Sequence, residues 1–328
     1  MPLLSVIIPV YNAGHNIYRL LDSLINQTMH DIEFICVVDC PTDGSDHICM
    51  EYAKKDKRIK LLINPINIGI AASRNRGIEE AIKYKSKYIG FADHDDYLEC
   101  SAYERLMSAA NNKGLEADVV FANSFIENKY SSARIYFNDP SWEGMIRSLL
   151  LPQDSKYNPN FLVRSVWNSV YKTSFIEQNT ICFKDRNLYL EEDTLFNLEV
   201  YIKTKNITYL NSFVYHWVIH ETSTSAKLED PDEVSEKMLR YLIHEWSLLS
   251  TSRLYEFRRD FQVMVSFYLR EYYFYIKIKN KEYKNALARL LHDCSFPIIG
   301  RYENLKLFSK KRLKLLGLVF WLKYFSVE

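Results

Sequence analysis

Segments with the pattern of buried strands alternate with helix-like segments through the first 122 residues, and this alternation constrains the fold most strongly. Residues 3–10 and 32–38 are short, β-branched and almost wholly apolar, which is typical of strands covered on both faces. Residues 59–63 read as a third strand, and the segments 16–27 and 70–84 read as helices. Strands and helices in alternation predict an α/β fold with a mainly parallel, doubly wound, Rossmann-like sheet flanked by helices.

Polar residues stand where three of the predicted strands end. Asn12 follows the first strand, Asp39 follows the second, and Asp93, Asp95 and Asp96 follow the fourth. Ligands of doubly wound sheets bind at the carboxyl ends of the strands, so we expect these residues to line one crevice. Three neighbouring carboxylates repel one another unless they face water or a cation. The Asp cluster therefore predicts a divalent-metal site that holds a phosphate-bearing ligand, with an acidic strand-to-turn junction as the alternative.

The sequence lacks the signatures of several other classes of protein. No G-x-G-x-x-G, no Walker loop and no Gly-rich, Arg-bearing loop of the pyrophosphorylase kind follows the first strand. A net charge of +1 gives no reason to expect a nucleic-acid partner. The six cysteines include no C-x-x-C pair, so we expect free thiols in a reducing cytoplasm, not zinc. We expect a cytoplasmic protein, because neither a signal peptide nor an apolar run of about 20 residues is evident.

Five short motifs resemble those of a known family. They are SVIIPVYN at 5–12, VVDCPTDGS at 37–45, NIG with SRNRG within 67–77, FADHDDYL at 91–98 and EEDTLF at 191–196. In this order they resemble the family 2 glycosyltransferases, the inverting GT-A-fold enzymes that build bacterial capsular, O-antigen or other surface polysaccharides. One position departs from the family pattern, because Val38 stands where the family commonly has the first of two acids.

The resemblance implies a donor site for a UDP-sugar. The residues that it assigns to the nucleotide and donor are Pro9, Tyr11, Asn12, Asp39, Asn67, Arg74, Asp93 and Asp96. Asp39 would accept the imide N–H of uracil, and Arg74 would pair with a carbonyl or diphosphate oxygen. Asp95, with Asp93, would hold Mn²⁺ or Mg²⁺ against the diphosphate, and His220 is a further candidate ligand.

The resemblance also implies a proton-transfer site and an acceptor side. Asp193 is the expected general base, with Glu192 as the alternative base. These acids would otherwise simply favour the N-terminus of a helix over 194–202. Trp167 and Asn168 lie in the acceptor-like segment 161–175, where aromatic rings either stack on sugars or pack in a core. The Ser/Thr-rich loop 222–225 would close over the donor.

The domain organisation changes near residue 225. We expect a catalytic domain over 1–225, with a nucleotide-sugar half at 1–122 and an acceptor half at 123–225. Residues 226–328 read as a C-terminal helical region. Its last part, 302–328, reads as a basic amphipathic helix that docks on an anionic membrane face, or else caps the catalytic domain or forms a dimer contact.

The expected function is the transfer of a hexose or N-acetylhexosamine from a UDP-sugar to a hydroxyl of a growing glycan or lipid-linked saccharide. The enzyme would depend on a divalent metal, invert the anomeric configuration and work at the inner face of the cell membrane; an oligomer is compatible with the sequence. Two alternatives stay open at this point. One is a non-catalytic protein that binds sugar nucleotides or glycans on the same fold, and the other is a nucleotidyltransferase.

Overall fold

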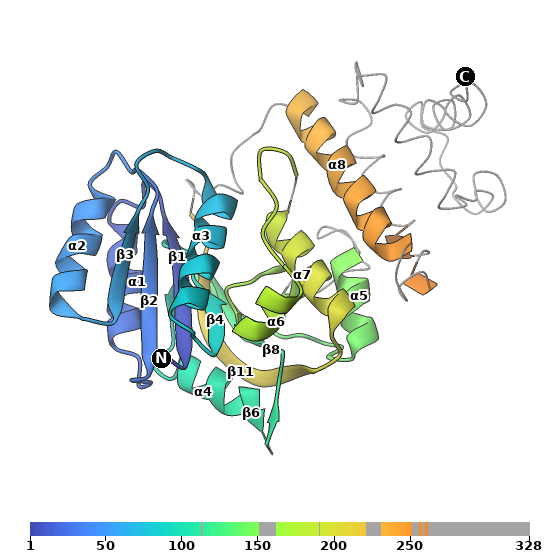
Figure 1. Cartoon of the computed structure of the whole chain (residues 1–328), viewed down its shortest axis with the longest axis horizontal. Helices are drawn as coiled ribbons and strands as arrows, with labels where there is room; N and C mark the ends of the chain where they lie inside the picture. The colour runs from blue at the N-terminus through green and yellow to red at the C-terminus, as the bar shows by residue number, and fades with distance from the viewer. Residues whose placement is uncertain are drawn as a thin grey trace. The chain divides into compact units, whose positions relative to one another are not determined.

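The computed structural model describes residues 1–112, 114–150, 162–189, 191–220, 231–250, 256–257 and 260–261 (Figure 1). The chain divides into two compact units. The first comprises Met1–Leu149, Asn160–Arg186 and Glu192–Lys227, and the second comprises Leu150–Pro159, Asn187–Glu191 and Leu228–Glu328. The domain boundary at residue 225 stays a prediction.

Strands and helices alternate through the first part of the chain as the sequence predicts, and the predicted strands 3–10, 32–38 and 59–63 match β1, β2 and β3 to within one residue. The strands are β1 (Leu4–Val10), β2 (Ile32–Val38), β3 (Ile59–Ile63), β4 (Tyr88–Phe91), β5 (Tyr97–Leu98), β6 (Asn111–Asn112), β7 (Leu115–Glu116), β8 (Val119–Asn128), β9 (Ser131–Ile135), β10 (Ser169–Lys172) and β11 (Ile207–Val218). The helices are α1 (Asn16–Ile25), α2 (Ser45–Lys55), α3 (Ile70–Lys83), α4 (Ala102–Ala110), α5 (Trp142–Leu150), the 3-10 turn η1 (Leu162–Arg164), α6 (Thr173–Gln178), α7 (Glu192–Lys203) and α8 (Pro231–Ser250).

Nearly all of the described strands of the first unit belong to one mixed sheet. Its order is β3-β2-β1-β4-β10-β8-β11-β5, and β9 pairs with β8. The first four strands in this order are parallel, so their carboxyl ends share one edge. Every residue of β1 and β2 is buried, which explains why their sequences are almost wholly apolar. The predicted α/β fold is therefore confirmed.

Strand β10 is the main departure from a simple doubly wound sheet. It runs antiparallel to both β4 and β8 and lies between them. The segment 161–175 was predicted only as an acceptor-side segment, because a strand of four residues is too short to show an alternating pattern. Strand β10 therefore joins the four parallel strands, which end with β4, to β8 and β11.

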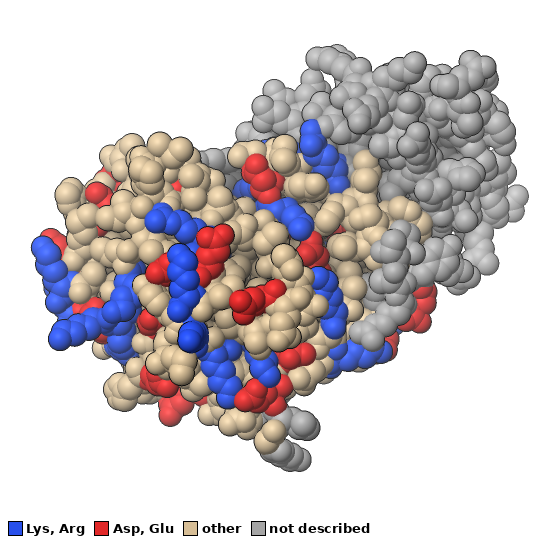
Figure 2. Space-filling view, in the orientation of Figure 1, with Lys and Arg blue, Asp and Glu red and all other residues tan. Residues whose placement is uncertain are grey.

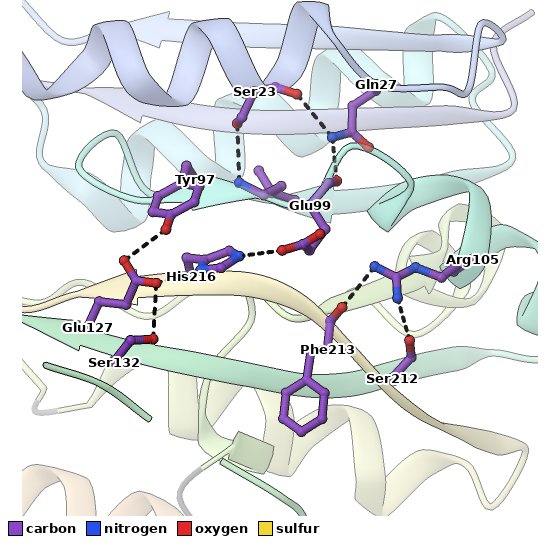
Figure 3. A network of polar contacts seen from close by, with 11 residues as sticks. Ser23, Gln27, Tyr97, Glu99, Arg105, Glu127, Ser132, Ser212, Phe213 and His216 are labelled. Atoms are coloured by element: carbon purple, nitrogen blue, oxygen red, sulfur yellow. Dashed lines mark hydrogen bonds and ion pairs between the residues drawn. The ribbon is translucent and has the colours of Figure 1, made fainter. Parts of the chain in front are cut away.

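The short strand β5 anchors the end of the acidic turn that follows β4 (Figure 3). It pairs with β11 through Leu98 and Tyr97. The His216 ring of β11 stacks on Tyr97 with centroids 4.1 Å apart, and its two nitrogens lie 2.8 Å from carboxylate oxygens of Glu99 and Glu127. The Tyr97 hydroxyl also donates to Glu127 over 2.8 Å. The network therefore ties the chain after the acidic turn to β8 and β11.

Helix α8 is the main element that the structure describes in the second unit. Helix α8 buries Met238, Leu242, Trp246 and Leu249, which lie at the helical spacing read from the sequence. The Trp246 ring stacks on Phe261 with centroids 5.3 Å apart. The loop 222–225, most of the predicted helical region beyond residue 250 and the basic tail 302–328 lie outside the described residues.

Among the helices that the structure describes, none has the length and apolar character needed to cross a bilayer. The five cysteines within the described ranges are free thiols, as predicted.

Candidate active site

Asp39, at the carboxyl end of β2, fixes the loop that leads into α3. Its side chain is buried and accepts hydrogen bonds from Asn64 Nδ2 at 2.7 Å and from the backbone N–H groups of Ile68 and Gly69 at 2.9 Å each. The side chain of Asn67, in the same loop, accepts from the Gly69 N–H over 3.2 Å. A carboxylate has about four acceptor positions, so about one position of Asp39 is left for a ligand donor.

The carboxyl end of β1 is linked to both of its neighbours in the sheet. Asn12 has a left-handed backbone with φ of 46°, and its Oδ1 accepts the Thr42 N–H after β2 over 2.8 Å. The carbonyl oxygen of Pro9 lies 3.2 Å from His94 Nδ1 in the acidic turn after β4. Tyr11 stands between these contacts with 45% of its surface exposed. The three strand ends therefore meet at one edge, as the parallel topology requires.

Asp96 is buried behind the acidic turn and is not exposed at the strand ends. Its side chain is 1% exposed, and its two oxygens accept from the Tyr215 hydroxyl at 2.9 Å and the Val218 N–H at 2.8 Å. Burial, with Asp93 and Asp95 nearby, raises the pKa of Asp96 well above its ordinary value. Asp96 holds the turn against β11, and we leave it out of the proposed donor site, in contrast to the sequence-based expectation.

Asp95 is half-buried and lies at the tip of the same turn. Burial raises the pKa of its carboxyl group; His94 opposes this rise and Asp93 adds to it. The Asp95 carbonyl oxygen accepts from Arg19 Nη2 at 2.8 Å and lies 3.4 Å from His220 Nε2. The structure thus brings His220, distant in sequence, beside the acidic turn.

Oxygen donors of this kind fit a hard divalent cation, since Mg²⁺ binds through one or two carboxylates together with substrate phosphates. Within the described ranges, no group of three or more His, Cys, Asp or Glu side chains is arranged to hold a metal. A cation at Asp95 would therefore need ligands from the substrate as well as from the protein.

Arg74 of α3 joins the acidic turn to the start of α7. Its Nη2 donates to Asp93 Oδ1 at 2.9 Å, and its Nη1 donates to Asp193 Oδ1 at 2.5 Å. Glu192 Oε1 lies 3.6 Å from the same Nη1. The Arg74 side chain is 2% exposed, whereas those of Asp93 and Asp193 are 27% and 24% exposed. One buried guanidinium is therefore hydrogen-bonded to two carboxylates, both of which are partly exposed to solvent.

Asp193 and Glu192 lie in the first turn of α7, where the helix dipole favours negative charge. The two residues differ in their surroundings. Glu192 is 6% exposed and also lies 3.5 Å from Arg186 Nη1, so it is the more enclosed of the two. Burial raises the pKa of Asp193 to about 7, against the opposing charge of Arg74. A carboxylate with this pKa, open to solvent, is well placed to take up a proton.

Ser73, Asn75 and Gly77 of the SRNRG motif each contribute to the position of Arg74. Ser73 Oγ accepts from Asn64 Nδ2 at 3.3 Å, which joins α3 to the Asp39 loop. Asn75 bonds both the N–H and the carbonyl of Phe183, at 2.8 and 2.9 Å. Gly77 faces Ile7 of β1, where a Cβ atom would come within 2.3 Å of Ile7 Cγ2. The glycine thus lets α3 lie close enough to the sheet for Arg74 to reach both acids.

The structure does not place Trp167 and Asn168 as open acceptor contacts. Asn168 is fully buried, and its Nδ2 donates to the carbonyl groups of Ala122 and Leu162 at 2.9 and 3.2 Å. Trp167 is 6% exposed and stacks on Tyr215 with centroids 4.5 Å apart. Of the two alternatives left open by the sequence, core packing is the one observed.

Tyr215 is a site residue that sequence reasoning missed. Its hydroxyl donates to Asp96 and accepts the Asp93 N–H at 3.0 Å, so it holds both ends of the acidic turn. Nothing in the sequence distinguishes this tyrosine from the other aromatic residues of an apolar strand. Only the antiparallel pairing of β5 with β11 brings it to the turn.

The mixed α/β sheet and the acidic turn at its strand ends agree with the GT-A fold expected from the sequence. The chain matches the model of "Glycosyl transferase family 2" over residues 5–178, more than half of its 328 residues. The "Putative glycosyltransferase EpsH" of Bacillus subtilis (strain 168) is 30% identical over 272 residues, which cover 80% of this chain and 74% of EpsH. The chain belongs to the family 2 glycosyltransferases.

Other relatives and solved structures agree with this family. The uncharacterized glycosyltransferase EpsJ of Bacillus subtilis (strain 168) is 32% identical over 66% of this chain, and the match covers 60% of EpsJ, less than two thirds of its length. The structure of S. aureus TarS 1-349 in complex with UDP-GlcNAc superposes with a TM-score of 0.70 at 19% identity, covering 98% of this chain and 90% of that chain. The mannosyltransferase PcManGT from Pyrobaculum calidifontis, in complex with GDP-Man and Mn²⁺, has a TM-score of 0.54 at 12% identity, over 98% of this chain and 86% of that chain. These two structures support the fold alone.

Proposed function

We propose that this glycosyltransferase is metal-dependent and inverting, and that it moves a hexose or N-acetylhexosamine from a UDP-sugar to a hydroxyl of a growing glycan or lipid-linked saccharide. The observation that carries the proposal is the pair of carboxylates, Asp93 and Asp193, on one buried guanidinium. One acid belongs to the turn at the nucleotide-type half of the sheet, and the other begins α7. An inverting transfer needs these two functions, leaving-group binding and proton removal, on opposite sides of one sugar.

The donor end of the reaction lies along the strand ends. Asp39 has about one acceptor position left for the imide N–H of uracil, and Asn12 and Asn67 border the same edge. The bound nucleotides of the TarS structures, UDP-GlcNAc and UDP, support this choice of donor. Asp95, with His220 beside it, would hold Mn²⁺ or Mg²⁺, which neutralises charge on the departing diphosphate when bound.

The acceptor end of the reaction lies at α7. Asp193 takes the proton of the acceptor hydroxyl as that oxygen forms its bond to the anomeric carbon. The bond between the anomeric carbon and the diphosphate oxygen breaks on the opposite face, and UDP leaves with the electron pair. The sugar passes through an oxocarbenium-like state, so attack from the far side inverts its configuration.

A screen of UDP-sugars and acceptors, read out as UDP release, tests the proposal. We expect release with Mn²⁺, loss of release with EDTA, and recovery when the metal is restored. Asp193→Asn should lower kcat by about 1000-fold or more, within the range expected when a general base is lost, and should leave UDP affinity nearly unchanged. Asp31→Asn is the matched control, because Asp31 is exposed and precedes β2 at the opposite edge of the sheet.

Three outcomes would contradict this function. UDP binding without turnover on any acceptor would favour a non-catalytic binding protein. Release of pyrophosphate in place of UDP would identify a nucleotidyltransferase. Undiminished turnover after EDTA treatment, with metal content checked by mass spectrometry, would remove the metal from the proposal while leaving the transfer intact.

We also propose that the enzyme works at the inner face of the cell membrane, where lipid-linked acceptors are used. The basis is the sequence of 302–328, which combines lysines and arginine with Leu, Phe and Trp residues.

A further inference from the structure

The two terminal nitrogens of the Arg74 guanidinium are paired with carboxylates, and the side chain is almost wholly shielded from solvent. Asp93 and Asp193 each take one of its terminal nitrogens, and Glu192 lies 3.6 Å from Nη1. Only 2% of the Arg74 side chain is exposed, whereas about a quarter of each of the two aspartates is open. A phosphate that entered the crevice would therefore meet the carboxylates before it met the guanidinium.

The surroundings of Arg74 hold it in this position. Its guanidinium lies over the Phe183 ring at 5.1 Å from the centroid. Phe183 is fixed in turn by two hydrogen bonds with Asn75, the neighbour of Arg74 on α3: Asn75 Nδ2 donates to the Phe183 carbonyl, and the Phe183 N–H donates to Asn75 Oδ1. Burial by itself would lower the pKa of Arg74, but the charges of Asp193, Asp93 and Glu192 raise it more. Arg74 therefore stays positively charged. A side chain packed in this way acts as a fixed part of the scaffold.

We propose that Arg74 is a positioning residue that sets the spacing between Asp93 and Asp193, and not a ligand of the donor diphosphate. A guanidinium is a planar fork, so carboxylates on its two terminal nitrogens are held at a fixed separation and in one plane. Asp93 belongs to the donor side and Asp193 is the proposed base. The spacing between the two therefore sets the distance between the donor sugar and the base. The inference rests on the proposed function for the roles of the two acids.

Removing the guanidinium should separate the acids. Asp93, Glu192 and Asp193 would then repel one another in a partly buried site without a cation between them. A lysine at this position keeps the charge but presents a single point, so it cannot hold two carboxylates in one plane. The effect should fall on the chemical step, because a misplacement of about 1 Å in a reacting pair costs about 100-fold in rate.

Steady-state kinetics on Arg74→Lys and Arg74→Ala, with UDP affinity measured separately, test the inference. We expect both variants to bind UDP within about threefold of the wild type and to lose about 100-fold in kcat. Free guanidinium at millimolar concentration should restore part of the kcat of Arg74→Ala, and methylammonium should not. Arg58→Gln is the control, since Arg58 is likewise an arginine paired with an aspartate, Asp56, at 2.7 Å, but lies away from the acidic turn and α7. Its kcat should match that of the wild type.

Two kinetic results would overturn the inference. A loss of UDP affinity of about tenfold or more with kcat unchanged would assign Arg74 to the diphosphate. A wild-type kcat in Arg74→Lys would mean that any cation suffices and that the fork shape has no role.

A thermal-unfolding cycle separates this inference from the proposed function, because it needs no activity. Arg74→Gln should lower Tm at pH 8, and adding Asp193→Asn should raise it again by about 2 °C or more, since one of the repelling charges is gone. Additive losses in the double variant would overturn the spacing role. If the cycle shows the expected coupling but the wild type releases no UDP from any donor, the proposed function fails and the spacing role stands.

Discussion

Asp93, Asp95 and Asp96 are neighbours in sequence, but their surroundings give them three different tasks. Asp96 is buried and bonded to Tyr215 and Val218, so it supports the turn. Asp93 faces Arg74 on one side and solvent on the other. Asp95 is the carboxylate that we propose binds a cation together with the substrate. The direction of each side chain out of the turn decides its role, which the D-x-D-D letters do not specify.

The raised pKa of Asp193 predicts how the rate of transfer depends on pH. Burial raises its pKa to about 7, with Arg74 opposing the rise. A general base works only when deprotonated, so kcat should reach a plateau above about pH 8 and should fall below pH 7, by about tenfold per pH unit well below the pKa. The measurement is kcat for UDP release at saturating donor between pH 5 and 9.

Samples held at each pH and returned to pH 8 before assay control for irreversible loss of enzyme. A profile that stays flat from pH 5 to 8 would mean that Asp193 does not titrate in the rate-limiting step.

At the scale of elements, α3 connects the two halves of the site. Its N-terminal end is fixed by Asp39 through the loop 64–69, and its next turn carries Arg74 and Asn75. The close approach of α3 to β1 at Gly77 makes this arrangement possible. The SRNRG motif is therefore a set of packing and bonding requirements on one helix, and its residues need not touch a ligand.

Gly77→Ala should destabilise the protein and slow transfer. The new Cβ would lie 2.3, 3.0 and 3.2 Å from three atoms of Ile7, including the Ile7 Cβ, so rotating the Ile7 side chain would not remove the clash. Overpacking of this kind costs about 1–3 kcal/mol, which we expect to exceed the gain of about 1 kcal/mol from replacing a helical glycine with alanine. Urea unfolding gives the free energy of unfolding, and UDP release gives kcat.

Gly90→Ala is the control, because its Cβ would meet no heavy atom closer than 3.5 Å. Equal unfolding free energies for Gly77→Ala and the wild type would mean that α3 does not need its present distance from β1.

At the scale of the whole molecule, the charge is balanced. The net charge is +1, and acidic and basic side chains are interspersed on the face of the described residues in Figure 2. This face therefore has no broad basic surface for an anionic polymer or membrane. Any electrostatic attraction to anionic lipid is more readily assigned to the basic sequence at 302–328 than to this face.

Deleting residues 302–328 should reduce binding to anionic vesicles, because each basic residue near such a surface contributes about 1 kcal/mol. Cosedimentation with phosphatidylglycerol vesicles measures the effect, and phosphatidylcholine vesicles serve as the neutral control. A full-length variant with Lys306, Lys310 and Lys311 changed to Gln separates charge from chain length. Binding that survives both changes would leave the tail as a packing or dimer segment.

The sequence by itself determined the alternation of strands and helices over the first 122 residues, the shared edge at which β1, β2 and β4 end, and the family. These depend on local periodicity and on short motifs, which are readable along the chain. Only the tertiary structure decided that Arg74 bonds Asp193, 119 residues away, that β10 enters the sheet antiparallel, and that Asp96 and Asn168 are buried. Each of these depends on which distant segments meet, and a side chain's chemistry is set by the neighbours that folding brings to it.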